Sequence, residues 1–125
     1  MNILIVDDDA ANRALLTEFL DLIGHTTVDR DDGSKVVACL QDEAIDIIFM
    51  DCKMPGMDGL TATREVRAYE QAVGRIAVPI IGLSGEVTDE NREQCAQAGM
   101  TSFLGKPFEL DALEALVNCI DASQH

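Results

Sequence analysis

Polar side chains that could do chemistry together directly follow four apolar runs of this 125-residue chain. Two carboxylates, Asp7 and Asp8, come after the first of these runs, and Asp51 comes after another. Ser84 and Lys106 follow two later runs and add a hydroxyl and an ammonium group. If the ends of these runs meet in space, the chain gathers several acids around one hydroxyl and one positive charge.

Carboxylates that crowd together repel one another and raise their own pKa values unless a cation neutralises them. A site of few carboxylates completed by water suits Mg²⁺. With Mg²⁺ and Lys106 neutralising a phosphoryl group and Ser84 hydrogen-bonded to it, a carboxylate can attack phosphorus. We choose Asp51 as this nucleophile because its run is apolar throughout, as a central strand should be. Asp9, nearest the following helix, is interpreted mainly as a helix cap.

Short apolar runs of strand length alternate with longer stretches of helical period, which predicts βα units around a parallel sheet. Because parallel crossovers are right-handed and need helices on both faces, we expect one doubly wound five-stranded sheet, an α/β fold. Three of the helices should end near Gly24, Gly74 and Gly99. The predicted strands cover residues 3–6, 26–28, 47–50, 80–83 and 102–104. Ligands bind beyond the carboxyl ends of such strands, where the polar side chains fall.

Composition excludes several classes of function. The chain has 23 Asp and Glu against 9 Lys and Arg, a formal charge of −14, which repels nucleic-acid phosphates, so direct nucleic-acid binding is not expected. No apolar run approaches the ~18 residues of a membrane span, which predicts a cytoplasmic protein without membrane insertion. Widely spaced cysteines without a metal-binding pattern predict reduced, mostly buried thiols: Cys39, Cys52, Cys95 and Cys119.

Four segments also resemble a known family. The chain is similar to the two-component response-regulator receiver domain over about residues 2–120, through residues 3–9 (ILIVDDD), 50–59 (MDCKMPGMDG), 80–84 (IIGLS) and 103–107 (FLGKP). The resemblance implies one receiver domain over residues 1–121 with a short tail at 122–125. Its fold would be flavodoxin-like, (βα)5, with strand order 2-1-3-4-5. Residues 50–67 look most like receivers of hybrid sensor kinases and phosphorelays, while the start at Met1 favours a stand-alone receiver.

In the family's scheme, Asp51 accepts a phosphoryl group from the phosphohistidine of a sensor histidine kinase or a histidine phosphotransfer protein. The resemblance implies that Mg²⁺ binds to four residues: Asp7, Asp8, Asp51 and Lys53, the last through its main-chain oxygen. Lys106 would pair with the phosphoryl group, and the Lys106–Pro107 peptide bond would be cis.

Ser84 and Phe103 would be the switch residues that follow phosphorylation. The face formed by the helix at 89–98, the strand at 102–104 and the last helix would then bind a downstream protein, and a phosphorylation-dependent homodimer is compatible with this scheme. Such a domain catalyses only its own phosphoryl transfer and slow dephosphorylation, so it is not an enzyme in the ordinary sense.

Two other functions stay open. A small Mg²⁺-dependent phosphatase could use Asp7 as its nucleophile, because Asp7 and Asp9 match the Asp-x-Asp pattern of haloacid-dehalogenase-like enzymes, although the later acidic pair and the length for a substrate cap are missing. A pseudo-receiver would bind a partner without phosphorylation, although every side chain that phosphorylation requires is present.

Overall fold

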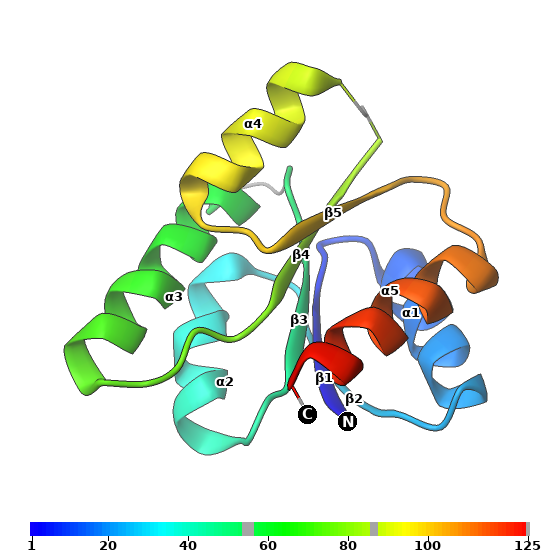
Figure 1. Cartoon of the computed structure of the whole chain (residues 1–125), viewed down its shortest axis with the longest axis horizontal. Helices are drawn as coiled ribbons and strands as arrows, with labels where there is room; N and C mark the ends of the chain where they lie inside the picture. Colours follow the sequence, from blue (N-terminus) through cyan, green and yellow to red (C-terminus); the bar gives the residue numbers. More distant parts are fainter. Residues whose placement is uncertain (54–56, 86–87, 125) are drawn as a thin grey trace.

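A computed structural model describes residues 1–53, 57–85 and 88–124 of the chain. Five parallel strands form one sheet in the order β2-β1-β3-β4-β5 (Figure 1). Their bounds are β1 (Asn2–Val6), β2 (Thr26–Arg30), β3 (Ile47–Asp51), β4 (Ile80–Ser84) and β5 (Ser102–Gly105). The predicted fold class and strand order are confirmed.

Helices follow every strand. They are α1 (Ala10–Leu22), α2 (Val36–Asp42), α3 (Gly59–Val73), α4 (Asp89–Ala98) and α5 (Leu110–Gln124), with a 3₁₀ turn, η1 (Gly33–Lys35), before α2. The predicted helix-ending glycines are confirmed, because Gly24, Gly74 and Gly99 have φ angles of 88°, 75° and 109°, in the left-handed region that glycine adopts without a Cβ clash.

The two faces of the sheet are covered by different helices, which gives two hydrophobic cores (Figure 1). On one face, Leu16 of α1 and Val117 of α5 pack against the sheet, and on the other Leu40 of α2 and Val66 of α3 do so. Alternate residues of β3 belong to opposite cores, since Phe49 packs on the α1 and α5 side while its neighbours in the strand pack on the other. All five residues of β3 are buried, as expected of a central strand covered on both faces.

The sheet edges are β2 and β5, neither of which has a residue buried as fully as those of β3. At the end of the chain, α5 continues to Gln124, so residues 122–124, which the sequence assigned to a tail, extend this helix. Neither glycine nor proline interrupts the helix there, which is why it continues. Among the described residues, the helices are too short or too polar to cross a lipid bilayer.

Candidate functional site

The acids predicted to gather at the rim of the sheet do so. β1 and β3 pair in parallel with Val6 opposite Met50, and this register places the next residues, Asp7 and Asp51, side by side. Asp7, Asp8 and Asp51 each offer a carboxylate oxygen, and these three oxygens lie within 4.8 Å of one another. Asp8 is exposed, whereas Asp7 is 0% and Asp51 6% exposed. The site is therefore a mostly buried acidic cluster that opens to solvent through Asp8.

Lys106 brings a positive charge to this cluster from the far end of the chain. Its Nζ lies 3.2 Å from Oδ2 of Asp7 and 3.4 Å from Oδ2 of Asp51. The backbone holds it there, because the Lys106 amide donates a 2.7 Å hydrogen bond to the Ser84 carbonyl at the end of β4. The Lys106–Pro107 peptide bond is cis, as predicted.

The charges of the cluster do not balance without a further cation. Burial, and then the negative charge of Asp7, raise the pKa of Asp51 from 3.8 to about 6, although Lys106 and the Lys53 amide, 3.2 Å from Oδ1, act in the opposite direction. Burial lowers the pKa of Lys106, but Asp51 and Asp7 outweigh burial, so the net direction is upward. Three hard carboxylate donors with one ammonium fit a divalent ion that prefers oxygen ligands.

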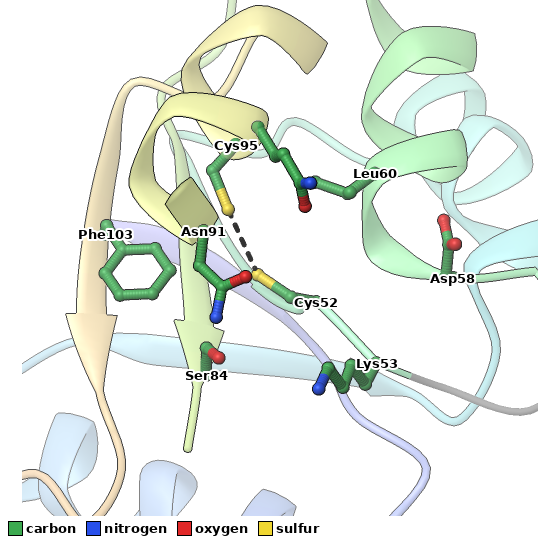
Figure 2. Close-up of a pocket in the computed structure, with 9 residues that line it drawn as sticks. Cys52, Lys53, Asp58, Leu60, Ser84, Asn91, Cys95 and Phe103 are labelled. Atoms are coloured by element: carbon green, nitrogen blue, oxygen red, sulfur yellow. Dashed lines mark hydrogen bonds between the residues drawn. The ribbon is translucent and has the colours of Figure 1, made fainter. Parts of the chain in front are cut away.

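Ser84 ends β4 and is 5% exposed, opposite Gly105 of β5. It lines a pocket of about 510 Å³ next to the acidic cluster, and Figure 2 shows Phe103 of β5 on the same wall of this pocket. The Phe103 ring is partly buried against the core on the α2, α3 and α4 side. The two residues predicted to act as switch residues thus line the same pocket.

Two residues that hold the site in place, Arg13 and Gly59, were given no role from the sequence. The Arg13 guanidinium donates a 2.7 Å hydrogen bond to the Asp7 carbonyl and another of 3.0 Å to Asp29, which fixes the turn after β1. Gly59 begins α3 directly against β3, and a Cβ there would collide with the carbonyl oxygen of Asp51. In the sequence, Gly59 stood out only as the last residue of the segment 50–59, and Arg13 carried no signal, because its type alone does not reveal its partner.

Asp9 caps α1, as predicted, since its side chain accepts a hydrogen bond of 2.8 Å from the amide of Ala11. Its own amide donates a 2.9 Å hydrogen bond to Oδ1 of Asp7. The amide of Asp9 therefore orients the Asp7 side chain, while the carboxylate of Asp9 caps α1.

Comparison with known proteins shows to which family a chain with this arrangement belongs. The family described as the response regulator receiver domain matches residues 3–118. The chain belongs to this family. The sensor histidine kinase RcsC of Salmonella typhi is 36% identical over 114 residues, which are 91% of this receiver domain but 12% of the kinase. This receiver domain spans between 10% and 15% of the length of such curated sensor proteins.

Two solved structures are similar to this receiver domain over most of its length. One is the receiver domain of the sensor histidine kinase PA1611 from Pseudomonas aeruginosa PAO1, with a magnesium ion coordinated in its active-site cleft. It is 36% identical, with a TM-score of 0.82, and the match covers 94% of this chain and 93% of that one. The other is the Saccharomyces cerevisiae receiver domain of Ssk1, in complex with the histidine phosphotransfer protein Ypd1. It is 27% identical, with a TM-score of 0.84, and the match covers 91% and 83% of the two chains.

These findings confirm the resemblance to receiver domains of hybrid sensor kinases and a fold suited to phosphoryl-accepting signalling. The acidic cluster is able to hold a metal ion. The roles of the individual residues stay predictions.

Proposed function

We propose that this receiver domain is a phosphorylation-dependent switch of a phosphorelay, with Asp51 as the acceptor of a phosphoryl group from a phosphohistidine. The observation that carries the proposal is the position of Asp51, 6% exposed, with its Oδ2 3.4 Å from the Lys106 ammonium and its carboxylate beside two others. In the transfer, a bond forms between an Asp51 oxygen and phosphorus while the bond from the histidine nitrogen to phosphorus breaks.

The same proposal assigns a Mg²⁺ site to Asp7, Asp8, Asp51 and the main-chain oxygen of Lys53. When bound, Mg²⁺ supplies positive charge that offsets the negative charge of the phosphoryl group. The oxygen donors of the cluster support this choice of ion, and the PA1611 receiver holds magnesium in its cleft. Lys106 pairs with the phosphoryl group, since its ammonium already contacts both buried carboxylates.

We propose that Ser84 and Phe103 transmit phosphorylation to the face formed by α4, β5 and α5, where a downstream protein binds. β5 is an edge strand, so a partner can reach it. The phosphodonor is a sensor histidine kinase or a histidine phosphotransfer protein, and the Ssk1 complex with Ypd1 supports the latter. The switch works in the cytoplasm without binding nucleic acid directly, and a phosphorylated homodimer is one form in which the changed face could be used.

Labelling with acetyl phosphate and Mg²⁺ tests the proposal. Wild-type protein should form an acyl phosphate, and Asp51→Asn should not, because the amide is no nucleophile. The matched control is Asp42→Asn, which removes one exposed carboxylate at the end of α2 and should leave labelling unchanged. Persistent labelling of Asp51→Asn would contradict the assignment of Asp51 as the phosphoryl acceptor.

Trapping with borohydride separates this proposal from the phosphatase alternative, because reduction should map to Asp51 in a receiver and to Asp7 in a phosphatase. Exposure supports Asp51 as the nucleophile, since its side chain is 9% exposed whereas that of Asp7 is 0% exposed. For a pseudo-receiver, Mg²⁺ should leave the thermal unfolding of the protein unchanged, whereas a functional acidic site predicts an increase in melting temperature.

A further inference from the structure

A pair of thiols lies beside the acidic cluster and has no part in the function proposed above. Cys52 directly follows Asp51, and Cys95 lies on α4, 43 residues further along the chain. Their sulfur atoms are 3.5 Å apart in a thiol hydrogen bond. Figure 2 shows the Cys95 side chain reaching from α4 toward Cys52. The fold, not local sequence, brings the two sulfurs together.

The pair can be reached from the pocket that Ser84 and Phe103 also line. Cys52 is 9% and Cys95 4% exposed, and both line this pocket of about 510 Å³ (Figure 2). A molecule the size of hydrogen peroxide can therefore enter beside them. The other two cysteines are placed differently: Cys39 contacts Glu43 of the adjoining helix end at 3.6 Å, and Cys119 is exposed on α5.

We propose that Cys52 and Cys95 form a disulfide on exposure to hydrogen peroxide, and that this bond ties α4 to the end of β3. One sulfur attacks a peroxide oxygen, the O–O bond breaks, and water and a sulfenic acid result. The second thiol then attacks that sulfur, the S–S bond forms, the S–O bond breaks, and a second water leaves. The two thiols lose two electrons in total, which reduce the peroxide, and a dithiol reductant restores both thiols.

Formation of the bond brings the sulfurs about 1.5 Å closer, since a disulfide is ~2.05 Å long. The end of β3 has little freedom to move, because the whole strand is buried and the sulfur of Cys52 packs over Gly82 of β4, 3.2 Å from where a Cβ would stand. By contrast, only Cys95 and Ala98 of α4 are buried. Most of the adjustment therefore falls on α4, which is drawn toward β3 and held there.

The consequence for signalling rests on the proposed function, in which α4 forms part of the partner-binding face. A covalent tie from α4 to the residue next to Asp51 prevents this helix from responding when the acceptor site changes. Oxidised protein should therefore lose the response of α4, whether or not Asp51 is still modified.

The disulfide is tested in the full chain carrying Cys39→Ser and Cys119→Ser, so that only the two proposed cysteines remain. After peroxide treatment, trypsin should release residues 36–53 joined to residues 93–125, with the loss of two hydrogen atoms and reversal by dithiothreitol. The matched control adds Cys95→Ser and should give no linked peptide. Separate oxidation of the two sulfurs to sulfinic acids, or the absence of the linked peptide, would overturn the proposal.

A second measurement does not depend on the folding of the variants. In the unsubstituted chain, which has four cysteines, peroxide should lower the number of sulfurs alkylated by iodoacetamide under denaturing conditions from four to two. Retention of all four reactive sulfurs after treatment would contradict the proposal.

The effect on α4 is measured by amide hydrogen exchange in the presence of Mg²⁺ and beryllofluoride, a mimic of the phosphoryl group. In reduced protein, exchange in α4 should change on addition of this probe, and in the disulfide form the change should be lost and return with dithiothreitol. An undiminished change in the oxidised protein overturns the proposed tie. If the reduced protein shows no change, the proposed function fails, while the peptide map still decides whether the disulfide forms.

Discussion

Replacing Asp51 by Asn should stabilise the metal-free protein, even though it removes the proposed phosphoryl acceptor. Burial and the charge of Asp7 raise the pKa of Asp51 from 3.8 to about 6. Because the pKa is higher in the folded state, folding favours the protonated acid; this contribution to stability is fully present below pH 3.8 and is lost as the pH rises through about 6. Asparagine keeps the shape of the protonated acid and cannot ionise, so the variant avoids this loss.

The gain follows from the two pKa values. They differ by about 2.2, and each pH unit corresponds to ~1.4 kcal/mol, so the free energy of unfolding should rise by about 3 kcal/mol at pH 8. At pH 5, where the folded protein is mostly protonated at Asp51, about half of this gain should remain. At roughly 3–5 °C per kcal/mol for a chain of this size, the melting temperature at pH 8 should rise by about 10 °C.

Urea unfolding in EDTA at pH 8 and pH 5, monitored by circular dichroism, measures the gain in free energy of unfolding at each pH. Asp42→Asn is the matched control, since it removes the same charge at an exposed position and should change stability by less than about 0.5 kcal/mol. Mg²⁺ at ten times its dissociation constant should stabilise the wild type by ~1.4 kcal/mol and Asp51→Asn by less. If Asp51→Asn is no more stable than Asp42→Asn at pH 8, attraction by Lys106 outweighs burial and repulsion, and the electrostatic account is refuted.

Three further substitutions test the site. Gly59→Ala should lower the free energy of unfolding, measured in urea, by about 1–3 kcal/mol, because the added Cβ meets the Asp51 carbonyl. Gly85→Ala is the control and should leave stability unchanged, since there is open space around its Cβ; equal stabilities of the two variants would contradict the packing argument. Lys106→Met should destabilise by about 2 kcal/mol at pH 8 and less at pH 5, where the carboxylates it leaves unpaired can protonate; a deficit independent of pH would disprove this cause. Asp8→Asn, at an exposed position, should leave metal-free stability within about 0.5 kcal/mol yet weaken Mg²⁺ binding in calorimetry at least ~10-fold; unchanged affinity would remove Asp8 from the proposed ligands.

The positions of the site residues could be predicted from the sequence because they depend on topology alone. Once the apolar runs are strands of one parallel sheet, Asp7, Asp51 and Ser84 must share the rim at the carboxyl ends of the strands, whatever the details of packing. The glycines that end helices could also be predicted, because the left-handed backbone at the end of a helix favours glycine at that position in the sequence.

Contacts between elements could not be predicted in the same way. The Cys52 and Cys95 thiols meet only because α4 is rotated so that Cys95 faces the sheet, and this rotation depends on packing along the whole helix. The support of Asp7 by Arg13 likewise depends on how α1 lies over β1. Gly59 belongs to the segment 50–59 that carries the family resemblance, but only the approach of α3 to the Asp51 backbone shows why a side chain is excluded there.

One imbalance of charge connects the stability of this receiver domain with its proposed function. Among the described residues, the rim gathers three carboxylates, and the Lys106 ammonium contacts two of them while the pKa of Asp51 still rises. A phosphoryl group on Asp51 would replace one negative charge by about two, which increases an excess that Lys106 already fails to cancel. Under the proposed function, a bound divalent cation would offset the same excess of negative charge that makes Asp51→Asn stabilising. A site balanced by a second lysine would fold more stably, but it would have lost the charge that draws the cation to the acceptor.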